Sequence, residues 1–430
     1  MRPRVEALFS GRDGSGPRAT VTAHALLGLA FVALIVSRKP DAWLAAQFWA
    51  EDGVVWYRQA YEMGWMSLLH PQNGYFQSVS KIAGNLAQLV SLPRAPLAFA
   101  VFALLFRLLP IWLLFSSRGK ALVPGVAGRL LIGFLYVAHP YSWEVFINVT
   151  NIHWHLAVAA LLVISFESWD NALQKACDVA IVLLCGLSGT FALFLAPISA
   201  WQWYRSRSRR SLVLATILLL AACIQLAAIA MTGAATRSPA PLDASWGDLF
   251  RIVGGQIAAA SILGDGWRHL FDSRLWQGTA LVPLAMSAGL VALMARAFLT
   301  GGHALRYFIA LSAMVFVAAL VQPQISNTQG QWPLFTRPGT GGRYAFIPIL
   351  AFHASLAWIA ASDHNLAFRR CARVLLAVVL VVGIPMSWNV RPYEDVGFLA
   401  RARQFERAAP GTVVEIPVNP RGWSFRLERK

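Results

Sequence analysis

The sequence has few charged residues, and acidic residues are scarcer than basic ones. Only 13% of its 430 residues are Asp, Glu, Lys or Arg, whereas 57% are hydrophobic and the mean hydropathy is +0.54. Because a soluble globular protein carries about 25% charged residues, this composition excludes a soluble multi-domain protein. Several apolar runs also reach the roughly 20 residues that a helix needs to cross about 30 Å of hydrocarbon. We therefore expect an integral membrane protein.

Cysteine is also scarce. The four cysteines lie within or at the edges of apolar segments, and their spacing matches no metal-binding motif (Cys177, Cys185, Cys223 and Cys371). No disulfide framework is implied, and the thiols are expected to pack as small core residues. The chain also lacks a GxGxxG turn, so it offers no Rossmann-type site for a sugar nucleotide.

Basic residues outnumber acidic ones, 37 to 20, and give a formal charge of +17. They fall in short clusters between apolar runs, as in WYRSRSRR at Trp203–Arg210. Such clusters are typical of cytoplasmic loops between membrane spans, whereas a nucleic-acid-binding protein gathers them on one polar domain. We therefore expect no nucleic-acid partner.

The apolar runs and basic clusters together predict an all-α polytopic membrane protein. Residues 1–18 are expected to form a basic cytoplasmic tail, residues 19–390 the transmembrane domain, and residues 37–95 its first outer loop. About eleven spans place each cluster of three or more basic residues before the C-terminal tail in the cytoplasm. Ala19–Val36 is expected to be an uncleaved first span rather than a signal peptide. Residues 391–430 are expected to form a small outer cap of one helix and two strands.

Three segments depart from simple spans. GLSGT at Gly186–Thr190 interrupts an apolar run and predicts a tight hairpin of two short helices. Leu249–Leu263 is expected to be a re-entrant or surface helix on the outer side. Phe76–Leu92, which contains Lys81, is expected to lie along the outer surface, because counting it as a span would reverse the positive-inside bias. A short span is the alternative.

Arg107 lies near the middle of the apolar run Pro96–Ser116, which is expected to be the second span. A charge at that depth in a membrane indicates a functional site. Snorkelling of the side chain, or a helix broken at Pro110, is the alternative.

The stretch FWAEDG, Phe48–Gly53, carries Glu51 and Asp52 side by side among many aromatic residues. Aromatic side chains favour the interface between membrane and water. On a helix the two carboxylates point roughly 100° apart, so they cannot both bind one atom. One is therefore suited to act as a general base and the other as a positioning or metal-binding group. The alternative is a pair that only solvates a loop or caps a helix.

Two further segments offer polar groups on the outer side. The predicted second outer loop, INVTNIHWH, contains Asn148, Asn151, His153 and His155. The two histidines would share a face only on an extended strand, so they are metal ligands or simply interfacial hydrogen-bonding residues.

The other segment is GTGGRYAFIP, Gly339–Pro348, in which glycines precede Arg343 and Tyr344 at the start of a span. Free backbone N–H groups and a guanidinium there suit a phosphate, although glycine-rich turns also simply end helices. Three further arginines are candidates for the same role (Arg251, Arg268 and Arg337).

The chain resembles the GT-C superfamily of membrane glycosyltransferases in its layout and in four short motifs. These motifs, which are similar to those of a bacterial subgroup, are FWAEDG, NVTNIHW (Asn148–Trp154), GRYAFIP (Gly342–Pro348) and IPVNPRGW (Ile416–Trp423). The chain departs from the better-known members because it has no Asp-x-Asp in the first loop, no WWDYG-type motif and no large outer domain. The resemblance implies a GT-C-like fold in a bacterial inner membrane with the active face outward.

The resemblance also implies a reaction and roles for individual residues. A sugar would pass from a polyprenyl-phosphate donor to a periplasmic glycan, lipid or protein acceptor. The expected base is Asp52 or Glu51, and the donor phosphate is expected at Arg343, Tyr344, Arg107 and Lys81. The residues expected to contact the substrate are Trp49, Tyr75, Asn148, Asn151 and His153. No residue is assigned to a metal, although a divalent metal remains open as a cofactor, and membrane lipids are expected to surround the chain.

Two other classes of function remain open. A flippase or transporter of lipid-linked glycans needs charged residues deep within its spans, and Arg107 is the candidate that the sequence offers. A non-catalytic membrane subunit that binds a glycan would explain the aromatic residues of the first loop without the acidic pair.

Overall fold

Within the residues that the structure describes, six helices are long and apolar enough to cross a membrane. The computed structural model describes residues 17–232 and 238–430, so most of the predicted basic tail, residues 1–16, lies outside the described residues. The six helices are α2 (Pro17–Arg38), α6 (Ala95–Phe115), α12 (Arg209–Thr232), α17 (Leu281–Thr300), α18 (His303–Val321) and α20 (Gly342–Ser362). They confirm the expectation of membrane-spanning helices.

Shorter helices pack among these six. They are α8 (Val126–Val137), α9 (Ile152–Ser165), α10 (Ala172–Gly186), α11 (Phe191–Ser206) and α21 (Leu366–Val378), the last continuing through η8 (Val379–Gly383) into α22 (Ile384–Met386). The predicted hairpin of two short helices is confirmed by α10 and α11, which are joined by a turn with Gly189 at a φ of 79°. Glycine adopts this left-handed conformation without the penalty that a side chain brings.

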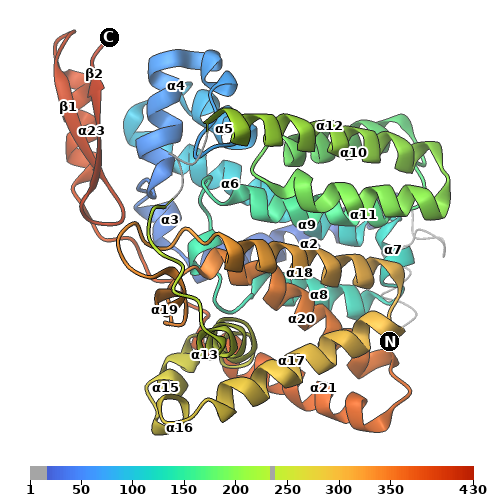
Figure 1. The fold of residues 1–430 in the computed structure, drawn as a ribbon. Helices are drawn as coiled ribbons and strands as arrows, with labels where there is room; N and C mark the ends of the chain where they lie inside the picture. The colour runs from blue at the N-terminus through green and yellow to red at the C-terminus, as the bar shows by residue number, and fades with distance from the viewer. Residues whose placement is uncertain (1–16, 233–237) are drawn as a thin grey trace.

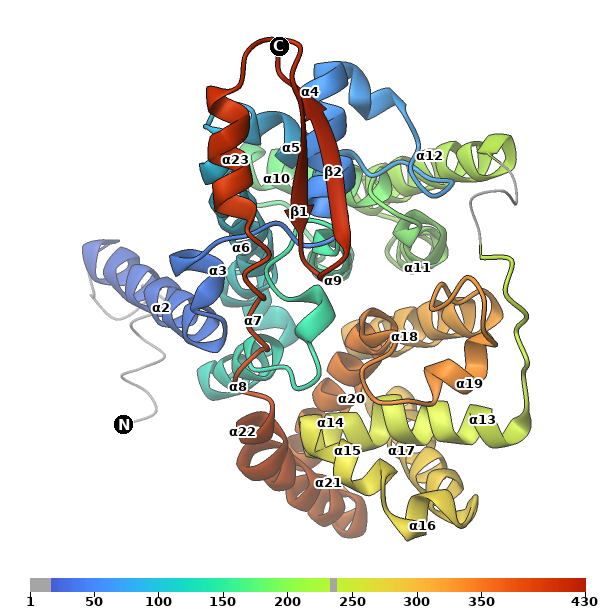
Figure 2. The same ribbon diagram turned by 90° about the vertical axis from the view of Figure 1, so that its left-hand side faces the viewer.

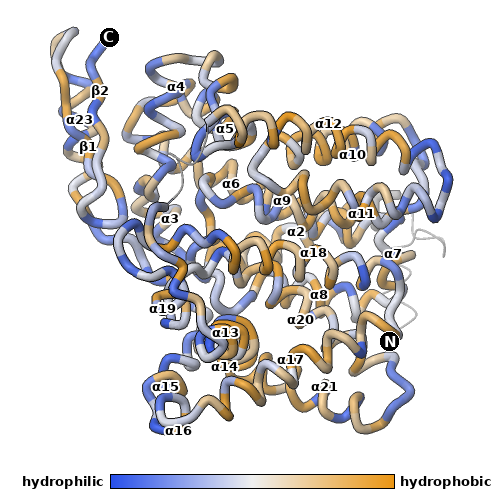
Figure 3. The backbone as a smooth tube through the Cα atoms, in the orientation of Figure 1, coloured by the Kyte–Doolittle hydropathy of each residue, from blue (hydrophilic) through white to orange (hydrophobic). Residues whose placement is uncertain are grey.

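The long helices lie side by side, and their connections gather at two ends of the bundle (Figure 1). At one end lie the segment between α2 and α6 and the C-terminal hairpin, and we call this the loop end. At the other end lie α7 (Gly119–Leu122) and the junction of α11 and α12, and we call this the basic end. Four arginines lie in the turn of this junction or in the adjoining ends of the two helices (Arg205, Arg207, Arg209 and Arg210). Hydrophobic residues dominate the long helices, and hydrophilic segments collect towards the two ends (Figure 3).

The bundle has two hydrophobic cores, one in each half of the molecule. The first is built by α2, α6, the helices α9 to α12 and the C-terminal segment, and the second by the elements from α13 to α22. Figure 2 shows the two groups one above the other. Helices α8, α18 and α20 contribute side chains to both cores, so they form the seam between the halves.

The first long loop consists of short helical pieces. They are α3 (Asp41–Leu44), the π-helix η1 (Asp52–Tyr57), α4 (Arg58–Met63), η2 (Gly64–Leu69), α5 (Ser78–Ala87) and η3 (Leu92–Arg94). Helix α5 has ten residues and is about 15 Å long, roughly half the thickness of the hydrocarbon core of a bilayer. The loop also binds the tip of the α10–α11 hairpin, where Ser78 N donates to the Leu187 carbonyl at 3.0 Å.

A second set of short elements covers the other half at the loop end. It comprises α13 (Trp246–Arg251), η6 (Ile252–Ala259), α14 (Ala260–Leu263), η7 (Gly264–Gly266), α15 (Trp267–Phe271), α16 (Arg274–Gln277) and α19 (Gln331–Phe335). The first three form one helical stretch that is seen end-on in Figure 1 and crosswise in Figure 2. It contains the segment Leu249–Leu263, which therefore runs across the long helices rather than along them.

The C-terminal segment confirms the prediction of one helix and two strands. Helix α23 covers Phe398–Arg407, and β1 (Val413–Val418) pairs antiparallel with β2 (Trp423–Glu428), from Val413 opposite Glu428 to Val418 opposite Trp423. Alternate strand residues are buried, as expected for a hairpin with one covered face. These residues belong to the first hydrophobic core, so the cap packs on the bundle and has no separate core.

Candidate functional site

Asp52 ties the first loop to the segment between α8 and α9. Its Oδ1 accepts hydrogen bonds from the backbone N and the hydroxyl of Thr150, both at 2.7 Å, and its Oδ2 accepts from Val149 N at 3.2 Å. The side chain is only 3% exposed. Both carboxylate oxygens are therefore held by two residues that lie almost 100 positions further along the chain.

Burial raises the pKa of the Asp52 carboxyl to about 7, although the hydrogen bonds from Thr150 and Val149 oppose this shift. The neighbouring charge of Glu51 raises it further. Within residues 17–232 and 238–430, no Lys or Arg side chain forms an ion pair with Asp52. A carboxyl group with such a pKa exchanges its proton readily near neutral pH.

Glu51 is the more accessible of the two acids. It is partly exposed, and among the described residues no other side chain donates a hydrogen bond to its carboxylate. Burial raises the pKa of Glu51, its own backbone N–H and the positive charge of Arg343 oppose the shift, and the charge of Glu144 adds to it. Glu51, Glu144 and Arg343 therefore form one electrostatic cluster from three distant parts of the chain.

Glu144 and Arg343 form the ion pair of this cluster. The Arg343 guanidinium donates to Glu144 Oε1, and the Arg343 backbone N donates to Glu144 Oε2 at 2.9 Å. Arg343 Nη2 also donates to the Gln324 carbonyl at 2.6 Å. Glu144 thus caps the N-terminus of α20, where backbone N–H groups favour an anion. This is the position at which the sequence predicted a phosphate, and the chain's own carboxylate fills it.

Glu144 is the main residue to which the sequence reasoning assigned no role. Its partner, Arg343, lies 199 positions further along the chain. In the sequence, Glu144 is the single acid between the apolar runs that form α8 and α9. An acid in such surroundings needs a cation or backbone donors, and this pattern could have indicated its role.

Asn148 and Asn151 build the turn that carries Glu144. Asn148 Nδ2 and Asn151 Nδ2 donate to the Glu144 carbonyl at 2.8 and 2.9 Å, and Asn151 N donates to Asn148 Oδ1 at 2.9 Å. Both residues are at most 5% exposed. Their amides therefore shape the site, and substrate contact would need this turn to open.

His153 and His155 lie in the first turn of α9 rather than in a loop. His155 bonds the Tyr136 hydroxyl and the Val145 carbonyl, at 2.7 and 2.9 Å, while His153 packs against Phe191 with ring centroids 5.7 Å apart. The two rings thus point in different directions. In the part of the chain that the structure describes, no three His, Cys, Asp or Glu residues are placed to hold a metal ion.

Three aromatic candidates, Trp49, Tyr75 and Tyr344, have different surroundings. Trp49 precedes the acidic pair and stacks on Tyr393 of the cap, with ring centroids 5.5 Å apart. Tyr75 belongs to a turn in which it and Gln72 exchange backbone hydrogen bonds of 2.9 and 3.2 Å. Tyr344 follows Arg343, and its hydroxyl accepts from Gln324 N at 3.0 Å. Trp49 and Tyr344 therefore flank the cluster.

Lys81 and Arg107 serve other parts of the fold. Lys81 Nζ donates to the Ser67 carbonyl at 2.5 Å and to the His70 carbonyl, at the end of η2. Arg107 Nη2 donates to the Val137 carbonyl at 3.0 Å, and Arg107 Cζ lies 4.1 Å from the centroid of the Phe146 ring. Both cations thus bind carbonyls at helix ends, where the helix dipole favours positive charge.

Arg268 lies beside the glycine turn that leads into α20. Its side chain is exposed and, among the described residues, forms no ion pair within 4 Å. A Cβ atom added at Gly339 would lie 3.2 Å from Arg268 Nη2, so the guanidinium sits against the glycine turn that leads into α20. The same turn is held by Tyr141, whose hydroxyl accepts from Gly339 N at 2.6 Å.

An apolar cavity of about 170 Å³ lies between α6, α8, α9, α18 and α20, with Leu114, Leu161, Phe308 and Trp358 among its walls. Glu51, Asp52, Glu144 and Arg343 are not among its lining residues, so the cavity is separate from the acidic cluster.

The comparisons with known proteins place the chain in no family. Its sequence matches no family model and no curated protein, and no solved structure matches it significantly.

Proposed function

We propose that the chain is a membrane glycosyltransferase of the GT-C type. It transfers a sugar from a polyprenyl-phosphate-linked donor to a glycan, lipid or protein acceptor. The observation that carries the proposal is the group of three acids, Glu51, Asp52 and Glu144, around one Arg343 at the loop end. Since Arg343 offsets only one of the three charges, the site keeps carboxyl groups that can accept a proton.

The proposed topology has eleven spans. They are the six long helices together with α8, α9, α10, α11 and the continuous stretch from α21 to α22. The arginine-rich turn at the basic end then faces the cytoplasm under the positive-inside rule. In a bacterial inner membrane this arrangement turns the acidic cluster towards the periplasm, where a lipid-linked donor arrives by diffusion in the bilayer.

Glu51 is the proposed base, and Asp52 is the proposed positioning residue. The two Asp52 oxygens are occupied by Thr150 and Val149, whereas the Glu51 carboxylate has room for an acceptor hydroxyl. Glu51 takes the proton of that hydroxyl while its oxygen bonds to the anomeric carbon of the sugar. The bond between that carbon and the phosphate oxygen breaks, and its electron pair leaves with the phosphate.

Arg268 is the proposed stabiliser of the departing phosphate. The charge of Arg343 is already offset by Glu144, whereas Arg268 is exposed beside the glycine turn that precedes α20. A fixed guanidinium next to the leaving oxygen stabilises the charge that develops there. No step in this mechanism requires a metal ion.

The test is transfer from a radiolabelled polyprenyl-phosphate sugar by the purified full chain. The double variant Glu51→Gln with Asp52→Asn is expected to fold and to lose transfer, and Glu51→Gln alone to lose about 10²–10⁴-fold, as for a general base. Glu62→Gln, an exposed acid of the same loop, is the matched control and should keep full activity. Retained transfer in the double variant would remove the base assignment.

The same preparation separates the alternative functions. A flippase would move the labelled lipid across a vesicle membrane without transferring its sugar, and a binding subunit would do neither. The transporter hypothesis relied on Arg107, but this guanidinium is engaged by the Val137 carbonyl and the Phe146 ring. Its contacts favour a role in packing.

A further inference from the structure

We propose that Asn419 is a positioning residue for the Glu51–Asp52 pair, so that the C-terminal cap, residues 391–430, is part of the site. Only the expected effect on catalysis rests on the proposed function. Its structural consequence, that the cap holds the acids in place, is testable without any substrate.

The cap and the first loop share a short stretch of parallel pairing directly before the acids. Asn419 N donates to the Phe48 carbonyl at 3.0 Å, and Ala50 N donates to the Asn419 carbonyl at 2.5 Å. The two bonds lie on either side of Trp49. They therefore fix the backbone up to the residue that precedes Glu51.

Ala50 has a φ of 43°, in the left-handed region that residues with a side chain seldom adopt. This conformation turns the extended strand into the helix that begins with the acids, where Asp52 N donates to the Trp49 carbonyl at 2.8 Å. Strained backbone persists only where surrounding contacts hold it. The bond from Ala50 N to Asn419 is such a contact, and it comes from the cap.

The Asn419 side chain holds the cap in register with the loop. Its Nδ2 donates to the Glu394 carbonyl at 2.9 Å and to Gln47 Oε1 at 3.3 Å, and its Oδ1 accepts from Glu394 N at 3.0 Å. Asn419 is only 3% exposed. One buried amide thus joins the loop, the start of the cap and the turn between its strands.

The cap also packs against the residue that follows the acids. A Cβ atom added at Gly53 would lie 2.9 Å from Val418 Cγ1 and 3.0 Å from Phe425 Cε1, so the hairpin touches the backbone there. On the other side, the Phe48 ring meets Phe398 and Phe425 with centroids 5.4 and 6.3 Å apart. Cap contacts therefore bracket Glu51 and Asp52 in the sequence.

This packing is one cause of the dry surroundings of Asp52. The charged and titratable groups that face it are Glu51 in its own helix and Tyr393 in the cap, with Glu144 and Arg343 next to Glu51. Because burial is the largest cause of the raised pKa of Asp52, loosening the cap should admit water and lower that pKa.

The experiment measures the unfolding midpoint of the full chain in detergent from pH 4 to pH 8. A carboxyl with a folded pKa above its unfolded value stabilises the fold at low pH, and this contribution disappears as the pH rises through about 7. The wild type should therefore lose stability over this range, and Asp52→Asn should show how much of the loss belongs to Asp52. Asn419→Ala is expected to lose at least half of that Asp52-dependent slope.

The matched control is Asn365→Ala. Asn365 caps α21 at the other end of the bundle, where its side chain accepts from Ala367 N and Phe368 N, and its loss should leave the slope unchanged. In the transfer assay, Asn419→Ala is expected to lower kcat about 10–100-fold with little change in KM, because a displaced base affects the chemical step. Asn419→Ser serves for both readouts if the alanine variant does not fold.

Each result either supports or overturns the positioning role of Asn419. A wild-type pH slope in Asn419→Ala, or a kcat unchanged in a variant that has lost the slope, overturns it and leaves the cap as a stabilising element. If Asn419→Ala loses the slope and no form of the protein transfers sugar, the positioning role stands and the proposed reaction fails.

Discussion

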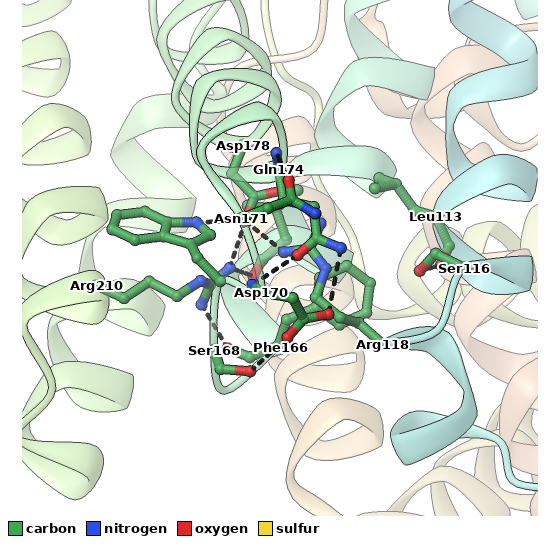
Figure 4. A network of polar contacts seen from close by, with 12 residues as sticks. Leu113, Ser116, Arg118, Phe166, Ser168, Asp170, Asn171, Gln174, Asp178 and Arg210 are labelled. Atoms are coloured by element: carbon green, nitrogen blue, oxygen red, sulfur yellow. Dashed lines mark hydrogen bonds and ion pairs between the residues drawn. The ribbon is translucent and has the colours of Figure 1, made fainter.

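Buried carboxylates have different charge partners at the two ends of the bundle. At the basic end, Asp178 is fully buried and accepts hydrogen bonds from Arg118 at 2.6 and 3.0 Å, from Arg210 at 2.9 Å and from the Trp169 indole at 2.9 Å (Figure 4). One anion thus meets two cations. The charge is satisfied, and the group joins α10 and α12 to the segment before α7.

In the cluster of Glu51, Asp52, Glu144 and Arg343 at the loop end, the acids outnumber the single cation. Glu144 takes the charge of Arg343, while Asp52 is held by neutral donors and Glu51 by no other side chain among the described residues. The same residue type is therefore structural at one end and, in the proposed reaction, catalytic at the other. The difference is the number of cations in reach, since an uncompensated acid in dry surroundings holds its proton near neutral pH.

The largest effect is expected at the basic end. Asp178→Asn leaves the guanidinium groups of Arg118 and Arg210 buried without an anion, which should cost about 3–5 kcal/mol of unfolding free energy. Thermal unfolding in detergent measures the loss. Asp170→Asn, an exposed acid nearby, should change stability by no more than about 0.5 kcal/mol, and an equal effect of both changes would refute the structural role of Asp178.

A smaller loss is expected for Glu144→Gln at the loop end. The neutral amide keeps an acceptor for Arg343 N but removes the partner charge of a partly buried guanidinium, so we expect a loss of about 1–3 kcal/mol. Glu394→Gln is the control, because its partners Arg391 and Arg421 are 86% and 80% exposed and such pairs contribute little. Equal stability of the wild type and Glu144→Gln would show that the ion pair does not hold α20 in place.

The smallest effect is expected for Lys81→Met in the first loop. Two carbonyls at the end of η2 lose their donor, which should cost about 1–2 kcal/mol. Burial also lowers the pKa of Lys81 to about 8, so the wild type should gain stability as the pH rises from about 8 to about 10, and the methionine variant should not. Unfolding midpoints across this pH range test both statements, and the same alkaline gain in the variant would assign it to another group.

The sequence was a good guide wherever the deciding signal is local. Apolar runs of about 20 residues marked the long helices, glycine and hydroxyl residues marked the turn at Gly186–Thr190, and the stretch PGTVVEIPV marked the strand around Ile416. Each of these features follows from a few neighbouring residues. The cap helix begins only at Phe398, because residues 391–397 make contacts with the first loop, such as that of Tyr393 N with Asp41.

The partners of the charged residues could not be predicted in this way. The motifs pointed to Asp52 and to Arg343, but Asp52 is held by residues 97 and 98 positions away, and Arg343 by an acid 199 positions away. Arg107 looked equally functional in the sequence. Its guanidinium stacks on Phe146 and binds the end of α8, and nothing near it in the sequence indicates this.

By itself, the sequence determined that this chain is a helical membrane protein with a small helix-and-hairpin cap, because hydropathy and turn chemistry act over a few residues. Only the tertiary structure decided which carboxylates meet a cation and which do not. That outcome depends on how α9, α20 and the cap pack around the first loop, and electrostatic energies depend on distance and burial, which sequence spacing does not specify.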